Sequence, residues 1–373
     1  MQGLRRPSSS CWLALLAAIG ASACAPATIS RESATPSELL ACHEQGVDAD
    51  GDGLDDACEM ALAETFAPIV IHSSAESTYP TDVDGFLTHT SLAFRDDACS
   101  AGRRPKVVAK APSESELLGH AIASPCGAES VTSDGSRSNR KHRTFFLTDV
   151  PDAFKIGAAD PARWRTYVHA YPNDLGGVTL QYWRFYAFNR AVANHGGDWE
   201  GIHVVLRSDH TVAQVGLLGH RSIDVVPPSA LAWERTHPVF YSEIGGHTSR
   251  ATGEAIAAHG CVDSSACAVS IQDLGTFTRQ ESWTGGRVVG PDGRVSPSGG
   301  LVNVGEKTAP LNGQSFIRYS GLWGSPGFFY VTSGYWGPAF NETSMTRDGF
   351  VTAWCTGMAR PLDVAKECWA SGG

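Results

Sequence analysis

Apolar and aromatic residues fall in short runs along this chain, separated by stretches rich in glycine and proline. The run Tyr182 to Phe188 is strongly aromatic, and Ile202 to Leu206 has apolar side chains at alternate positions. Runs of this kind predict strands, as do Phe66 to His72, Val212 to Leu218 and Pro238 to Glu243. The chain has 40 glycines and 20 prolines for turns. The pattern therefore predicts a mostly β fold, a β-sandwich.

Two long stretches interrupt the strand pattern and are expected to be loop insertions. Residues 100–143 are polar, with few periodic apolar positions, and residues 251–315 are glycine-rich and irregular. We therefore expect one β-sandwich domain over residues 67–373 that carries both insertions. Residues 37–66 are expected to hold a short helix, Ser37 to Glu44, then a calcium loop and an exiting helix from Cys58 to Phe66.

The first residues predict export. Two arginines precede an apolar run, Cys11 to Ile19, which is too short to span a membrane and is followed by small residues. This order is typical of a secretory signal peptide over residues 1–23. Small residues directly before Cys24 resemble a bacterial lipoprotein cleavage box, which predicts a lipid-anchored envelope protein. The alternative is ordinary cleavage and a secreted protein. Residues 24–36 would then be a tether.

The cysteines agree with an exported protein. Of ten cysteines, one lies in the signal peptide and Cys24 is the lipidation candidate. An even number of cysteines remains, which in an exported chain predicts disulfide bonds. We expect pairs of sequence neighbours, with other connectivities open: Cys42 with Cys58, Cys99 with Cys126, Cys261 with Cys267, and Cys355 with Cys368.

The charge limits the partners. The formal net charge is −10, and no block of lysine and arginine stands out. A nucleic-acid partner is therefore not expected. Membrane association is expected only through a lipid anchor.

The stretch Asp48 to Glu59 matches the twelve-residue calcium loop. Acids occupy its first, third and fifth positions, glycine its sixth and glutamate its twelfth. Six acids in twelve residues repel one another unless a cation compensates them. One copy of the loop favours a structural calcium ion over a calcium switch, and the alternative is a solvated acidic linker. The expected ligands are Asp48, Asp50, Asp52, the Leu54 carbonyl, Asp56 and Glu59.

A second candidate site follows the aromatic strand, in the sequence His195-Gly-Gly-Asp-Trp-Glu200. Side chains alternate along a strand, so Asp198 and Glu200 share a face and Trp199 lies on the other. Carboxylates on a core face are unfavourable unless something compensates them. A second divalent metal of unknown identity would do so, with His195 and His247 as nitrogen ligands. The alternative is an exposed turn with solvated carboxylates.

The order of these segments resembles a known family. Leu62 to Val70, the aromatic strand, His195 to Gly201 and His237 to His247 follow one another as in the vacuolar protein sorting-associated protein number sixty-two family. Members of that family are largely uncharacterised, so the resemblance implies little about activity.

The Asp-Trp-Glu core also resembles the Gly-His-Arg-His-Asp-Trp-Glu motif of necrosis- and ethylene-inducing-type toxins. His195, Asp198 and Glu200 match that motif, whereas Gly197 stands in place of its second histidine. In those β-sandwich proteins the motif holds a divalent cation that engages sphingolipid sugar headgroups. The resemblance implies a metal site, and toxin activity does not follow from it.

Three functions are compatible with these residues. The first is a binding protein whose ion organises a site for a sugar or a lipid headgroup. The second is a metal-dependent hydrolase with an open coordination position, and the third has purely structural ions. The sequence contains no Gly-x-Ser-x-Gly elbow and no phosphate-binding loop before a helix. Binding is therefore the favoured hypothesis, and catalysis stays open.

Overall fold

The computed structural model describes residues 46–96, 105–124, 127–130, 143–173, 175–191, 194–219, 222–253, 277–327, 334–338, 342–346 and 349–352. The chain divides into two compact units, and all of these residues belong to the second, Ala34–Gly373. The expected signal peptide, Cys24, the tether, the expected helix Ser37 to Glu44 and every cysteine of the expected pairs except Cys58 lie outside the described residues. Within the described ranges, no helix is both long and apolar enough to cross a membrane.

A six-stranded sheet carries the Asp-Trp-Glu sequence. Its strands are antiparallel to their neighbours, except that β18 runs parallel to β7. The predicted aromatic and alternating runs lie inside its two longest described strands, β8 and β9, which extend beyond both runs and take in His195. The order across this sheet is β11 (Ser222–Val226), β10 (Val212–Gly219), β9 (His195–Leu206), β8 (Val178–Asn189), β7 (Thr166–Pro172) and β18 (Leu301–Asn303).

A second large sheet is built around β1 (Ile69–Ser73). This strand runs parallel to β13 on one side and antiparallel to β15 on the other. The order is β12 (Ala232–Glu234), β13 (His237–Ser242), β1, β15 (Phe277–Glu281), β16 (Arg287–Val289) and β17 (Val295–Pro297), with β14 (Ser249–Arg250) paired to β13.

Part of the expected insertion at 251–315 therefore belongs to a sheet. The strand β15 reads Phe-Thr-Arg-Gln-Glu, and its buried positions include Gln280 and Glu281. A search for apolar runs passes over such a strand because polar side chains occupy its buried face. Part of the expected insertion at 100–143 also belongs to a sheet, because β3 (Lys106–Lys110) pairs with β2 (Ser91–Asp96).

The remaining elements are short. Ser315–Arg318 is a 3-10 helix. The strand β6 (Arg143–Thr148) completes the sheet of β3 and β2. Three two-stranded sheets are β4 (Ala121–Ser124) with β5 (Gly127–Ser130), β19 (Gly305–Glu306) with β20 (Ala309–Pro310), and β21 (Glu342–Thr346) with β22 (Gly349–Thr352). The helices are α1 (Asp56–Phe66), α2 (Val83–Leu87), α3 (Glu114–Leu118) and the 3-10 turns Pro161–Arg163 and Pro228–Ala230.

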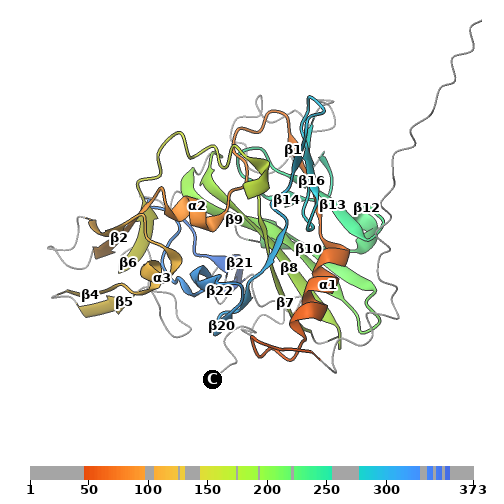
Figure 1. The fold of residues 1–373 in the computed structure, drawn as a ribbon, viewed down its shortest axis with the longest axis horizontal. Coiled ribbons are helices and arrows are strands. Elements are labelled where there is room, and N and C mark those ends of the chain that lie inside the picture. The colour runs from red at the N-terminus through yellow and green to blue at the C-terminus, as the bar shows by residue number, and fades with distance from the viewer. Residues whose placement is uncertain are drawn as a thin grey trace, which may run out of the picture. The chain divides into compact units, whose positions relative to one another are not determined.

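The strands β8 and β9 are buried on both faces. Trp199 belongs to one hydrophobic cluster, with Trp183 and Trp323, whereas Ile202 and Val204 belong to another. The second cluster contains residues of both large sheets and of α1, which packs against β7, β13 and β18 (Figure 1). The mostly β, sandwich-like architecture is as predicted. Asp198 and Glu200 share the face of Ile202, so they lie between the sheets.

Candidate metal centre and buried polar network

The acidic loop folds into a tight turn around its first carboxylate. Asp48 accepts hydrogen bonds from the backbone N–H groups of Gly51 at 2.7 Å and Gly53 at 3.0 Å. Both glycines have positive φ angles, +82° and +93°, which favour a residue without Cβ. Asp52 accepts from the backbone of Leu54 at 2.7 Å. The alternation of acid and glycine therefore turns the carboxylates toward one another.

Carboxylate oxygens from five of the predicted ligand residues converge in two overlapping groups. In each group the oxygens lie within 4.8 Å of one another, and Asp50 belongs to both. Asp50 is 6% exposed and Glu59 is 1% exposed. The sixth predicted residue, Leu54, has its side chain in the core between the sheets. The groups are Asp48, Asp50 and Asp56, and Asp50, Asp52 and Glu59.

Three of these oxygens have no hydrogen-bond partner among the described residues. They are Asp50 Oδ2, Asp52 Oδ2 and Glu59 Oε1, and all three are buried. A buried carboxylate oxygen normally accepts a hydrogen bond or binds a cation, because leaving it bare is unfavourable. The loop therefore offers the carboxylate ligands of an oxygen-ligated cation site, and three of their oxygens still lack a partner that a cation would supply.

The electrostatics of the loop agree with this interpretation. Burial, with repulsion from Asp52 as the next cause, raises the pKa of Asp50 to about 7. Burial also raises the pKa of Asp52 to about 6 and, with repulsion from both aspartates, that of Glu59 to about 10. Without a cation Glu59 therefore keeps its proton at neutral pH, Asp50 is partly protonated, and Asp52 is mostly ionised. A divalent ion that binds them would displace those protons.

Residues far along the chain hold the loop on the sheet. Asn303, in β18, donates a hydrogen bond to Glu59 Oε2 at 2.6 Å across a sequence separation of 244 residues. Glu306 contacts His169 Nε2 at 2.9 Å and repels both Asp50 and Asp52. The sequence analysis missed Asn303 and Glu306, because no local pattern relates them to the loop.

The helix that leaves the loop, α1, begins at Asp56, ahead of the predicted start at Cys58. Asp55 caps α1 by accepting a hydrogen bond from the backbone of Cys58 at 2.9 Å. Cys58 is disulfide-bonded, and its partner lies outside the described residues. Its pairing with Cys42 therefore stays a prediction.

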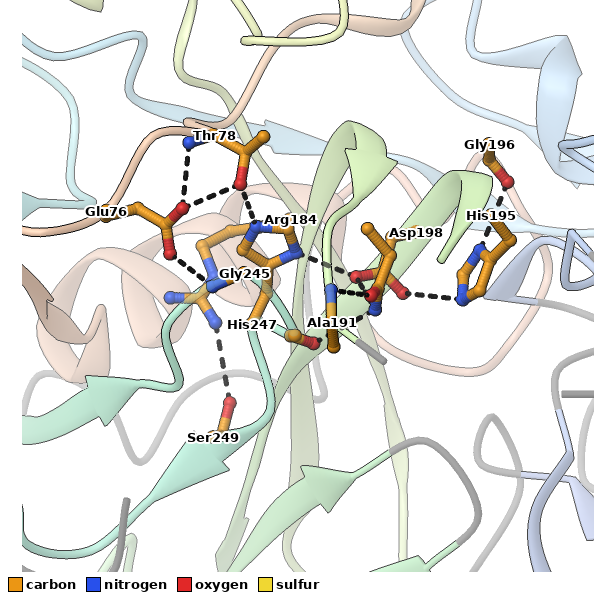
Figure 2. A network of polar contacts seen from close by, with 12 residues as sticks. Glu76, Thr78, Arg184, Ala191, His195, Gly196, Asp198, Gly245, His247 and Ser249 are labelled. Carbon is orange, nitrogen blue, oxygen red and sulfur yellow. Dashed lines mark hydrogen bonds and ion pairs between the residues drawn. The ribbon is translucent and has the colours of Figure 1, made fainter. Parts of the chain in front are cut away.

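The second predicted site is a buried hydrogen-bonded network around Asp198 (Figure 2). Asp198 Oδ2 lies 2.8 Å from His247 Nδ1 and accepts from Asn189 Nδ2 at 3.0 Å. His195 Nε2 lies 4.0 Å from Asp198 Oδ1. The structure thus brings together three of the four residues that the sequence analysis assigned here.

The second ring nitrogen of His247 is also engaged. Its Nε2 lies 2.8 Å from Thr78 Oγ1, and the Thr78 hydroxyl donates to Glu76 Oε1 at 2.7 Å. The imidazole ring stacks on Tyr186 with centroids 3.7 Å apart. Because the Thr78 hydroxyl donates its one proton to Glu76, its oxygen can accept a hydrogen bond from His247 Nε2.

Glu200 faces a cation that the sequence analysis missed. Arg184 lies directly opposite Glu200 in the register of β8 and β9. Burial lowers the pKa of the Arg184 guanidinium, and attraction from Tyr186, Glu200 and Asp198 opposes that shift. Arg184 could have been found from the sequence, because it is the one charged residue in the run Tyr182 to Phe188.

The fourth predicted residue does not complete a metal ligand set with the other three. Among the described residues, the groups of three or more metal-type ligands within 4.8 Å are the two in the acidic loop. Both nitrogens of His247 have protein partners, and Arg184 places a fixed positive charge beside the carboxylates. The described residues thus form no such ligand group at this position, and the second metal stays a prediction.

Packing explains the glycines of the motif. Gly197 has a φ of +60°, and a Cβ there would lie 2.3 Å from the Trp323 carbonyl oxygen. A Cβ at Gly201 would lie 1.8 Å from the Tyr182 carbonyl oxygen. The departure from the toxin motif at Gly197 thus has a steric cause, since a histidine side chain has no room at this position.

The network has the order hydroxyl, imidazole, carboxylate that nucleophilic triads use. Thr78, His247 and Asp198 are each at most 1% exposed, however, and the Thr78 hydroxyl donates to Glu76. A substrate has no access to this hydroxyl in the structure. The arrangement is therefore suited to holding segments together rather than to nucleophilic attack.

Comparisons with known proteins add weak structural neighbours. No protein-family model matches the chain, and no curated protein matches it. Among solved structures, Necrosis and Ethylene inducing Protein 2 from the causal agent of cocoa's witches' broom disease is 16% identical over 51% of this chain and 67% of its own, with a TM-score of 0.28. The protein NLPPya in complex with glucosamine is 13% identical over 52% and 67%, with a TM-score of 0.28.

A structure described as a toxin fold for microbial attack and plant defense is 12% identical over 57% of this chain and 75% of its own, with a TM-score of 0.29. These neighbours include the toxin type that the Asp-Trp-Glu sequence resembles, and none of the comparisons supports the vacuolar protein sorting family. The TM-scores are too low for the likeness to support a function.

Proposed function

We propose that this protein is a calcium-binding β-sandwich protein with a binding rather than a catalytic role. The observation that supports it is the convergence of buried, unpartnered oxygens from Asp50, Asp52 and Glu59. An all-oxygen set with several carboxylates is the environment that Ca²⁺ prefers in proteins. Because Asn303 joins Glu59 to β18, the ion would fasten the loop and α1 to the sheet.

The proposal includes export, lipidation of Cys24 and a polar ligand such as a sugar or a lipid headgroup. The sequence of residues 1–24 supports the first two, and the resemblance of His195 to Glu200 to the toxin motif suggested the third. Outside the cell, calcium modules work with dissociation constants of roughly 10⁻⁴ to 10⁻³ M. A structural ion of this affinity would stay bound there.

Calcium titration of the mature chain tests the central part of the proposal. We expect one Ca²⁺ per chain by calorimetry, and a melting temperature that falls when a chelator is added, because an ion that binds only the folded state stabilises it. Asp50→Asn and Glu59→Gln should each weaken binding by about tenfold or more, since each removes a charged ligand.

Asp152→Asn is the matched control, because Asp152 is an exposed aspartate paired with Lys155. It should bind calcium as the wild type does. A protein that binds no calcium and melts at the same temperature with and without chelator would show that the loop is only an acidic linker.

A further inference from the structure

Each of the three bare oxygens in the acidic loop belongs to a carboxylate whose other oxygen is already engaged. Asp52 Oδ1 accepts a hydrogen bond from the backbone N–H of Leu54 at 2.7 Å, and Asp50 Oδ1 accepts one from that of Asp52 at 3.4 Å. Glu59 Oε2 accepts from Asn303 Nδ2 at 2.6 Å. The partner oxygens, Asp50 Oδ2, Asp52 Oδ2 and Glu59 Oε1, are the three bare ones. Each carboxylate therefore presents one oxygen to the proposed ion.

The donor to Glu59 differs in kind from the other two. The aspartates receive backbone N–H groups of the loop itself, two residues further along the chain. Glu59 receives a side-chain amide from β18, 244 residues away. In the twelve-residue calcium loop, the glutamate at the twelfth position normally binds the ion through both oxygens. An N–H group at hydrogen-bond distance from one of those oxygens competes with the ion for it.

The amide of Asn303 is held in a fixed orientation. Its Oδ1 accepts a hydrogen bond from the backbone N–H of Gly305 at 3.0 Å, so its nitrogen is the end that faces Glu59. The Asn303 backbone carbonyl accepts from Asn312 Nδ2 at 2.9 Å. Asn303 is 2% exposed and Glu59 is 1% exposed. The donor is therefore buried against Glu59 Oε2 and tied to the sheet on both sides.

The number of ligating oxygens decides which divalent ion fits the loop. The six predicted ligand residues supply six oxygens if Glu59 contributes one, and seven if it contributes two. Ca²⁺ accepts roughly six to eight oxygens in a flexible arrangement, whereas Mg²⁺ demands a near-octahedral arrangement of about six. A loop with six ligating oxygens therefore suits both ions, and a seventh oxygen favours Ca²⁺.

We propose that Asn303 is a positioning residue that restricts Glu59 to one ligating oxygen, so that the loop accepts Mg²⁺ as well as Ca²⁺. The inference rests on the proposed calcium site and adds which ions compete for it. The ion bound in the loop would then depend on the ratio of the two ions around the protein.

Separate calorimetric titrations with Ca²⁺ and Mg²⁺ test this inference. In the wild type the two dissociation constants should lie within about a hundredfold of each other, and Asp50→Asn should weaken both ions. Asn303→Ala should raise the preference for Ca²⁺ over Mg²⁺ by about tenfold or more, because both oxygens of Glu59 become available. Mere loosening of the loop would weaken both ions alike, so the ratio of the two constants reports the restraint itself.

Asn312→Gly is the matched control. Asn312 donates to the backbone of Asn303 and not to Glu59, and its φ of +51° suits glycine. It should leave the ratio unchanged. If Asn303→Ala does not fold, the wild type decides, because a preference for Ca²⁺ far above about a hundredfold overturns the inference and a smaller one supports it.

The outcomes also separate this inference from the calcium proposal. Calcium binding with the same ratio in the wild type and Asn303→Ala overturns the role of Asn303 and leaves the calcium site standing. A protein that binds neither ion overturns both proposals.

Discussion

At the scale of single residues, the acidic loop would couple proton binding to binding of the proposed calcium ion. Asp50, Asp52 and Glu59 hold protons in the metal-free fold more tightly than exposed carboxyl groups do, because burial raises their pKa values. The unfolded chain releases those protons near the ordinary values for Asp and Glu. The difference makes the stability of the metal-free protein depend on pH.

We predict that the metal-free protein loses stability as the pH rises. A group whose pKa is raised by folding contributes stability that is complete below its unfolded pKa and is lost as the pH rises through its folded pKa. For Asp52 and Asp50 this window ends at about 6 and about 7. The melting temperature in chelator should therefore be higher at pH 5 than at pH 8.

The variant Asp50→Asn separates the loop's contribution to the pH dependence of stability from the contributions of other titrating groups. The variant should lose less stability between pH 5 and pH 8 than the wild type does. Saturating calcium should reverse the trend in the wild type, because bound carboxylates must be ionised. Equal pH profiles for the metal-free wild type and Asp50→Asn would contradict the prediction.

At the scale of elements, the bend that begins β9 depends on a glycine. Gly197 combines a φ of +60° with a close approach to Trp323. We predict that Gly197→Ala costs more than about 2 kcal/mol, because the left-handed backbone alone costs a non-glycine residue roughly 1–2 kcal/mol and the clash adds to it. Urea denaturation measures the difference.

Gly285→Ala provides the control for that measurement. Gly285 also has a positive φ, +75°, but a Cβ there meets nothing within 4 Å. Its substitution should therefore show the backbone cost alone. If Gly285→Ala destabilises the protein as much as Gly197→Ala does, packing against Trp323 is not what selects glycine at Gly197.

The elements also show how far the sequence could predict the structure. The strand β8 was predictable because aromatic residues dominate the run Tyr182 to Phe188, and the end of β9 because apolar side chains alternate from Ile202 to Leu206. The helix α1 was predictable from Cys58 onward as the helix that leaves the loop. The strand β15 was not, since Gln280 and Glu281 are buried on polar partners. The contact between Glu59 and Asn303 was equally hidden, because it depends on tertiary packing.

At the scale of the whole molecule, the loop is part of the main core rather than an appendage. Leu54, Leu62 and Phe66 pack in the same cluster as Val70 of β1 and Tyr182 of β8. Loss of the proposed ion would therefore loosen a segment that both large sheets contact.

We predict that chelation shifts one cooperative melting transition and does not create a separate early one. Calorimetry in calcium and in chelator measures this, with near- and far-ultraviolet circular dichroism as independent probes. The sheets and the loop should melt together in both conditions. A new low-temperature transition, with the main transition unmoved, would show that the loop unfolds independently of the sheets.

The hydrogen bond between Glu59 and Asn303 limits when the acidic loop can reach its final structure during synthesis. Chains emerge from the ribosome N-terminus first, so the acidic loop exists long before β18 does. Until residue 303 appears, the loop carboxylates lack the asparagine that places Glu59. Strand β1 likewise waits for β13 and β15. The proposed calcium ion would therefore bind firmly only after β18 has been synthesised.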